Sequence, residues 1–191
     1  MKTLFWNVRE SATRAALLEA TCCQLDDEAC GAVEERCCAA GVPDGHCHDL
    51  AEVHAVVDAL CASDRVKQDL RDVYRILAEA EAAAHGCTVD QTHFHEVGNA
   101  AGIRNALHLC LAIEAFAPDE IVCTSVQTGE GVVACAHGEL AVPAPATAAI
   151  RARGSPVCDS KLPGERCTPT SAALIWHFAD RCEAWESAGS D

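Results

Sequence analysis

The segment from Thr92 to Gly98 reads T-H-F-H-E-V-G and carries two imidazoles and a carboxylate on a short apolar stretch. Successive side chains of a β-strand point to opposite faces, so a strand here places His93 and His95 on one face. Two imidazoles about 7 Å apart along a strand can share a metal ion or flank a substrate. The segment predicts a metal or catalytic site formed by His93, His95 and Glu96. A structural hydrogen-bond network at a strand-to-helix junction is the alternative.

A second group of ligand-type side chains is His46, Cys47 and His48, which follow a turn in a glycine-containing loop. Imidazole and thiolate are ligands of transition metals, so these residues are a second candidate metal site. A solvated loop is the competing interpretation. The histidines at positions 54, 85, 108 and 177 lie on predicted helices, and we expect structural roles for them.

The chain contains 14 cysteines but no C-x-x-C motif, which is against a zinc ribbon or a thioredoxin-like motif. Cys22-Cys23 and Cys37-Cys38 are adjacent pairs, and neighbours in sequence rarely hold a tetrahedral metal. We therefore expect most of the cysteines to act as small buried hydrophobes. The stretch from Cys37 to His48 is the best place for an exception.

Composition narrows the function classes. A length of 191 residues suits a single domain, and the net charge of −15 argues against nucleic acid as a partner because phosphates repel an acidic surface. No stretch approaches 18 consecutive apolar residues, and the first residues lack a signal-peptide layout. We expect a cytoplasmic protein that does not contact membranes.

Periodicity and end signals predict a mixed chain. The clearest helix covers 64–85, with Ser63 as its N-cap and Gly86 as its stop. Asp49 caps the preceding helix, and Glu52 stands at the reciprocal position of a capping box. Further helices are expected at 11–20, 26–40, 49–60, 100–116, 146–153 and after 168, and strands at 2–8, 93–96, 119–125, 131–136, 139–142 and near 157.

The fold class that follows is α/β: a compact mixed domain with helices packed around a small mixed sheet that includes one β-hairpin. We expect one domain over 1–186 and a frayed tail at 187–191. The hairpin turns on His137 and Gly138, where glycine supplies a positive φ. His137 either serves this turn or faces the site.

The last helix opens with T-P-T, where Thr168 is the expected N-cap and a proline occupies the first helical position. Exposed N–H groups and the hydroxyls of Thr168 and Thr170 make this helix start a candidate anion site, and Arg166 lies just before it. Ordinary N-capping explains the same residues.

Three segments together resemble the LarC family, the nickel-insertion proteins of nickel-pincer cofactor biosynthesis. They are A-E-A-E (78–81) followed by T-H-F-H-E-V-G (92–98), C-A-H-G-E-L-A-V-P-A-P-A-T (135–147) and G-E-R-C-T-P-T-S-A-A-L (164–174). The match is strong over 49–180 and weak over 1–48.

The resemblance implies a nickel chelatase, a lyase that inserts nickel into a pyridinium mononucleotide bearing two thiocarboxylates and consumes CTP. It implies catalytic roles for His93, His95 and Glu96, with the two histidines also as metal ligands beside His46, Cys47 and His48. Substrate-binding roles fall on His137, Arg166, Thr168 and Thr170.

The chain departs from the family pattern at several points. R-E-S-A-T-R-A (9–15) replaces a Gly- and Asp-bearing loop, and Ala101 and Asn105 replace two aspartates. The family's CTP-handling C-terminal domain is not in this sequence, so CTP enters only if a separate subunit supplies that domain. The expected activity is that of a short LarC-like form. The alternatives are a non-catalytic nickel-binding or carrier protein and a structural partner of a full-length paralogue.

A metal-accepting mononucleotide needs imidazole or soft ligands at one end and an anion cradle at the other. We therefore expect His95 and Thr168 to border one pocket, separated by about 15 Å or less, the length of a small ligand. Separate packing duties are the alternative.

Overall fold

The computed structural model describes residues 1–94, 97–135 and 138–183. Its helices are α1 (Arg14–Cys22), α2 (Asp27–Ala39), α3 (Leu50–Ala59), α4 (Asp64–His85), the 3₁₀ turn η1 (Val89–Gln91), α5 (Ala100–Phe116), α6 (Pro145–Arg151) and α7 (Pro169–Phe178). Its strands are β1 (Thr3–Trp6), β2 (Glu120–Thr124), β3 (Gly129–Glu130), β4 (Val132–Cys135), β5 (Gly138–Ala141), β6 (Gly164–Glu165) and β7 (Arg181–Glu183). The predicted α/β class, with helices around small sheets and one hairpin, is confirmed.

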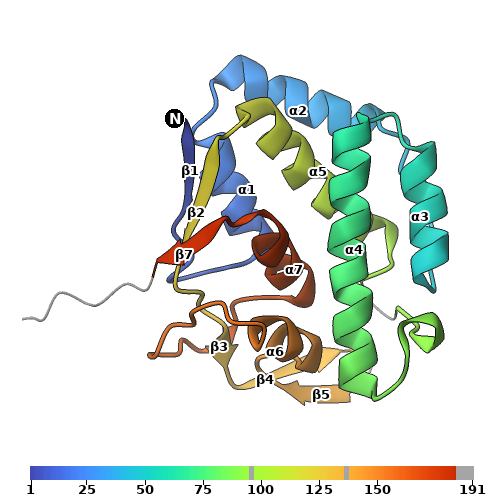
Figure 1. Ribbon diagram of the computed structural model, residues 1–191, viewed down its shortest axis with the longest axis vertical. Coiled ribbons are helices and arrows are strands. Elements are labelled where there is room, and N and C mark those ends of the chain that lie inside the picture. Colours follow the sequence, from blue (N-terminus) through green and yellow to red (C-terminus); the bar gives the residue numbers. More distant parts are fainter. Residues whose placement is uncertain (95–96, 136–137, 184–191) are drawn as a thin grey trace, which may run out of the picture.

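The main sheet has three parallel strands in the order β1-β2-β7. Parallel neighbours cannot be joined by a tight turn, so long helical crossovers separate these strands in the chain. Leu4 and Trp6 turn one face of β1 into the core, while Phe5 points to the other face and is exposed. The sheet lies at one edge of the molecule, beside the helices (Figure 1).

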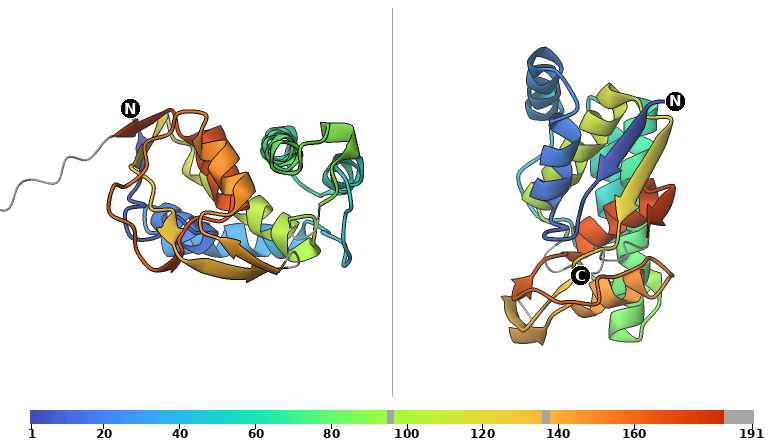
Figure 2. Two further views of the ribbon diagram at one scale, coloured as in Figure 1. Left: turned by 90° about the horizontal axis from the view of Figure 1, so that it is seen from below. Right: turned by 90° about the vertical axis from the view of Figure 1, so that its left-hand side faces the viewer.

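The helices pack around α4 and α5. Helix α1 contacts β1 and α5, α2 lies on α5, and α4 contacts α3, α6 and α7 (Figures 1 and 2). The stripe of Val66, Leu70, Val73 and Leu77 along α4 is completely buried, as its helical spacing predicts. Among the described residues, no helix combines the length and the apolar character that a membrane span requires.

Local signals fix the helix ends. Ser63 Oγ accepts a hydrogen bond of 3.2 Å from Val66 N, and Gly86 ends α4 with a φ of +66°. Asp49 caps α3 by accepting from Glu52 N at 2.8 Å. In a capping box the Glu52 carboxylate would accept a hydrogen bond from the backbone N of Asp49. Here it accepts from the backbone N of His48 instead.

The strand predicted at 93–96 is wrong for its described part, since Thr92–Phe94 belong to no strand. This segment follows η1, and Phe94 N donates to His48 O at 2.8 Å, so it makes local contacts with a loop instead of a ladder. Residues 95 and 96 lie outside the described residues. The short strands β3, β6 and β7 were not predicted, because two or three residues carry no periodicity.

The 13 described cysteine side chains are all free thiols, but only five are buried: Cys37, Cys47, Cys110, Cys123 and Cys167. Five more are partly buried, and Cys23, Cys38 and Cys61 are exposed. We predicted that most cysteines are buried, and full burial holds for only five of the 13 described.

Candidate functional site

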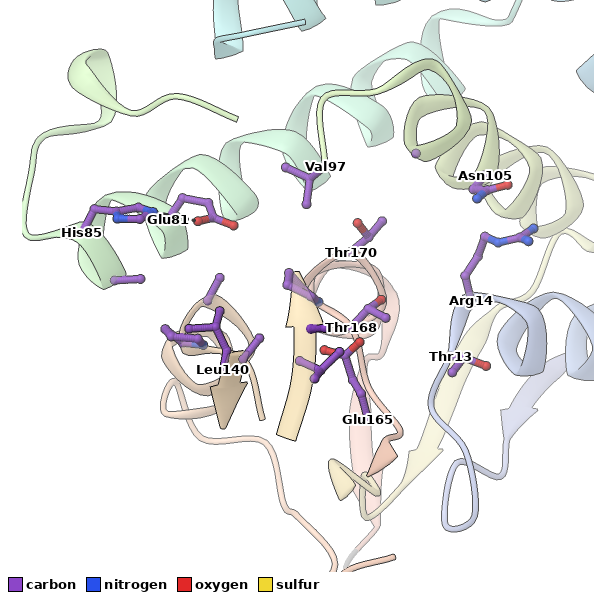
Figure 3. A pocket seen from close by; sticks show the side chains of 18 of the residues that line it. Thr13, Arg14, Glu81, His85, Val97, Asn105, Leu140, Glu165, Thr168 and Thr170 are labelled. Atoms are coloured by element: carbon purple, nitrogen blue, oxygen red, sulfur yellow. Dashed lines mark ion pairs between the residues drawn. The ribbon is translucent and has the colours of Figure 1, made fainter. Parts of the chain in front are cut away.

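A cavity of about 660 Å³ lies where several elements meet. The first residues of α1, α5, α6 and α7 border it, together with the last turn of α4 and the β4–β5 hairpin (Figure 3). This volume falls within the range of small-molecule sites. The candidate site is therefore a pocket shared by segments that are far apart in sequence.

One end of the pocket is built by the start of α1 and the second turn of α5. Thr13 is the N-cap of α1, and its Oγ1 accepts from Ala16 N at 3.4 Å. Arg14 and Asn105 are half-buried and face the pocket (Figure 3). Neither side chain makes a hydrogen bond or ion pair with another described residue. Their donors are available to an anionic ligand.

The start of α7 forms the middle of the pocket. Thr168 Oγ1 accepts from Ser171 N at 3.3 Å, which confirms the predicted N-cap, and Thr170 lines the cavity beside it (Figure 3). Helices α1, α5 and α7 all begin at this cavity, so the positive ends of three helix dipoles point toward it. This arrangement favours negative charge in the ligand.

The opposite end of the pocket carries an acid and an imidazole. His85 Nε2 lies 3.6 Å from Glu81 Oε2 at the end of α4, and Leu140 of the hairpin forms part of the apolar wall nearby (Figure 3). The pocket is therefore bipolar, with a guanidinium at one end and a carboxylate–imidazole pair at the other.

The described part of the histidine motif lies close to this pocket. Val97, within the T-H-F-H-E-V-G segment, lines the cavity, and its carbonyl accepts from the buried Tyr74 hydroxyl at 2.9 Å. His93 is exposed. His95, Glu96 and His137 lie outside the described residues, so the expected separation of His95 and Thr168 stays a prediction.

Two segments lie side by side, and we call residues 45–48, 93–94 and 97–100 together the histidine junction. Cys47 N donates to Gly98 O at 2.8 Å and Ala100 N donates to Gly45 O at 3.0 Å. His46 Nε2 is 2.7 Å from the Phe94 carbonyl oxygen, and the His46 and His48 rings are 4.9 Å apart. The fold thus places the loop that carries His46 and His48 beside the described residues of the T-H-F-H-E-V-G segment.

The ligand-type residues of the 45–48 loop differ in burial. Cys47 is buried, and burial, followed by the charges of Glu52 and Asp49, raises the pKa of its thiol. His48 is exposed. Within residues 1–94, 97–135 and 138–183, no group of three or more His, Cys, Asp or Glu side chains is arranged to hold a metal. The metal roles of these residues stay predictions.

Arg166 faces elsewhere: its Nε donates to Pro163 O at 2.9 Å, and it does not line the described pocket. Sequence reasoning missed Arg14, Asn105, Glu81 and His85 as pocket residues. Glu81 is the last residue of the A-E-A-E segment that resembles the family, and Asn105 stands where the family has an aspartate. The sequence therefore offered a reason to consider both residues. It offered none for Arg14 and His85, because only the tertiary fold brings them to the cavity.

Residues 6–189 match the profile of the nickel insertion protein family. A relative from Geotalea uraniireducens with a provisional nickel insertion name is 41% identical over 138 residues, which cover 72% of this chain and 34% of that protein. The pyridinium-3,5-bisthiocarboxylic acid mononucleotide nickel insertion protein of Staphylococcus epidermidis is 34% identical over 129 residues, or 68% of this chain and 32% of that protein. The chain thus spans about a third of the length of these curated relatives. No solved structure matches it.

Proposed function

Because the chain belongs to the nickel insertion protein family, we propose that it binds a pyridinium mononucleotide with two thiocarboxylates and takes part in inserting nickel into it. The observation that carries this proposal is the bipolar pocket, in which Arg14 has no partner among the described residues. The relative from Staphylococcus epidermidis bears the name of this reaction.

The phosphate of the mononucleotide belongs at the end of the pocket that holds Arg14. A guanidinium binds phosphate oxygens with paired N–H donors, and the α1 and α7 dipoles add to the attraction. Asn105 and Thr170 offer further donors beside it. These residues bind and orient the substrate and take no part in the chemical step.

The pyridinium ring and its thiocarboxylates then extend toward Glu81, His85 and the histidine motif. In this arrangement His93, His95 and Glu96 hand nickel to the two sulfurs, which are ligands that nickel prefers over water. His46 and His48 supply a second pair of imidazoles beside that motif through the histidine junction. Nickel is the cargo of the reaction, and CTP is the expected co-substrate of a separate C-terminal domain.

Calorimetric titration with nicotinic acid mononucleotide, a pyridinium mononucleotide without thiocarboxylates, tests the phosphate site. Removing a charged hydrogen bond costs about 1.5–3 kcal/mol, so Arg14→Ala should weaken binding roughly 10- to 100-fold. Arg75→Ala is the matched control, because Arg75 is exposed on α4 and pairs with Asp72 at 2.8 Å. Equal affinity of Arg14→Ala and the wild-type protein refutes the assignment.

The activity itself needs a separate assay. The chain is mixed with nickel, CTP, the thiocarboxylated mononucleotide and a C-terminal domain from a relative, and formation of the nickel-loaded product is followed. Product that depends on His93 and His95 supports the insertion reaction. No product under any of these conditions, with mononucleotide binding intact, refutes the activity but not the binding site.

A nickel carrier is the second candidate function, favoured by the close approach of His46 and His48. Imidazoles bind metal only when neutral, so nickel uptake by a carrier should release protons and weaken on acidification. Titration calorimetry on reduced protein is the test, with the double variant H46A/H48A as comparison. Binding that is unchanged in this variant removes the loop from consideration.

A further inference from the structure

Arg151 is a buried cation without a carboxylate partner. It is the last residue of α6 and only 6% exposed, and its Nη2 donates to Pro156 O at 3.0 Å. Its Nε and Nη1 make no hydrogen bond with any described residue. An arginine stays protonated in a protein interior, and uncompensated buried charge is costly. A compensating anion should therefore lie nearby.

The titratable groups whose charges act on Arg151 are thiols, those of Cys167, Cys182, Cys123 and Cys158. Two of them form a pair, because Cys123 of β2 and Cys182 of β7 are directly opposed in the parallel ladder. Opposed residues of neighbouring strands carry their side chains on the same face of the sheet. The two sulfurs therefore lie on the same face of the sheet, and the charge of Arg151 acts on both thiols.

The two thiols differ in access and in acidity. Cys123 is completely buried, whereas Cys182 is partly exposed on β7, an edge strand of the sheet. A hydrogen bond from Cys123 lowers the pKa of Cys182 to about 7; burial opposes this change, and Arg151 adds to it. The same hydrogen bond, together with burial, raises the pKa of Cys123. Near neutral pH Cys182 is therefore the thiol that ionises, whereas Cys123 keeps its proton.

We propose that Cys182 and Cys123 form a thiol–disulfide exchange site, in which Cys182 is the attacking thiolate, Cys123 the resolving thiol and Arg151 the counter-cation. The partner is a small disulfide of the glutathione type. A divalent metal ion does not suit this site, because the positive charge of Arg151 repels it. This site is therefore separate from the nickel chemistry.

Exchange proceeds in two displacements. The Cys182 thiolate attacks one sulfur of the small disulfide, forms a mixed disulfide and releases the first small thiolate, which takes a proton from water. Cys123 then loses its proton and attacks Cys182 Sγ, and the second small thiolate leaves and is protonated. Two protein thiols are oxidised to one disulfide, and one small disulfide is reduced to two thiols.

The first test is the pH dependence of alkylation of Cys182 by iodoacetamide in the reduced full chain, read by peptide mass spectrometry. The wild-type midpoint should fall near pH 7. Arg151→Met should move it upward by roughly one pH unit and slow alkylation at neutral pH about fivefold, because a thiolate without its cation is less stable. Cys61, an exposed thiol, should react equally in both proteins.

Cys123→Ala is a second variant that keeps the proposal testable if Arg151→Met does not fold. It removes the hydrogen bond to Cys182 and should also raise the midpoint. The second test treats the chain with oxidised glutathione and maps its disulfides without reduction, where we expect a link between Cys123 and Cys182. A midpoint unchanged in both variants, or oxidation that links Cys182 to any other cysteine, overturns the proposal.

Discussion

Gly98 is the tightest point of the histidine junction, and replacing it with alanine tests whether that junction is as close as described. A Cβ at this position would lie 2.0 Å from Cys47 O and 3.0 Å from Phe94 Cβ. Neither contact can be relieved by rotating a flexible side chain, because the nearest atom belongs to the backbone. Residues 45–48 must therefore move away from residue 98.

The cost of Gly98→Ala follows from what this movement breaks. The bonds Cys47 N→Gly98 O and Ala100 N→Gly45 O are worth about 1 kcal/mol each. Overpacking adds about 1–3 kcal/mol. We expect a total loss of about 3–5 kcal/mol in the free energy of unfolding, which corresponds to about 6–20 °C in Tm for a domain of this size.

Urea unfolding followed by circular dichroism measures this loss, with Gly31→Ala as the matched control. Gly31 lies within α2 with nothing within 4 Å of an added Cβ, so the same substitution should stabilise the helix by about 0.5–1 kcal/mol. If Gly98→Ala unfolds at the same urea concentration as the wild-type protein, the two segments are not packed as described and the reasoning fails.

Three further perturbations address the framework of the pocket. Tyr74→Phe should cost about 1–2 kcal/mol in urea unfolding, because the buried Val97 carbonyl loses its hydroxyl donor; no loss would mean that this bond is not formed in solution. Ser63→Ala should lower Tm by a few degrees, about 1 kcal/mol, through loss of the α4 cap, and Ser63→Thr, which keeps the hydroxyl, should restore part of it. Burial raises the pKa of Glu114, but hydrogen bonds from Ser63 and Arg36 outweigh it, so the folded-state pKa lies below the unfolded value. Glu114 then stabilises the fold fully above the unfolded pKa and loses this effect as pH falls through the folded pKa. The stability difference between the wild type and Glu114→Gln should shrink accordingly on acidification; a pH-independent difference would contradict this.

The sequence predicts those parts of the fold that local interactions determine. The ends of α4 follow from a serine cap and a terminal glycine, and its buried stripe follows from helical spacing. The T-P-T start of α7 was identified for the same reason. Each of these features depends on residues within one or two turns of each other.

Local interactions along the chain do not predict the pocket. Arg14 and His85 lie in different helices, and only the packing of the fold brings both to one cavity. The segment before Val97 alternates like a strand, yet it pairs with the loop at His48, a partner that periodicity cannot reveal. The partnership of Arg151 with the Cys123–Cys182 pair was equally hidden, since it depends on the register of β2 against β7.

The strand order β1-β2-β7 also constrains how the protein folds as it leaves the ribosome. Leu4 pairs with Ile121, and Cys123 pairs with Cys182, so the first strand emerges long before its neighbour and the last strand follows after another long delay. Helices α2 to α5 can form early through local contacts, whereas closing the sheet requires contacts between distant residues and is slow. Until β7 has been synthesised, β2 has an open edge whose unpaired N–H and C=O groups can pair with other chains.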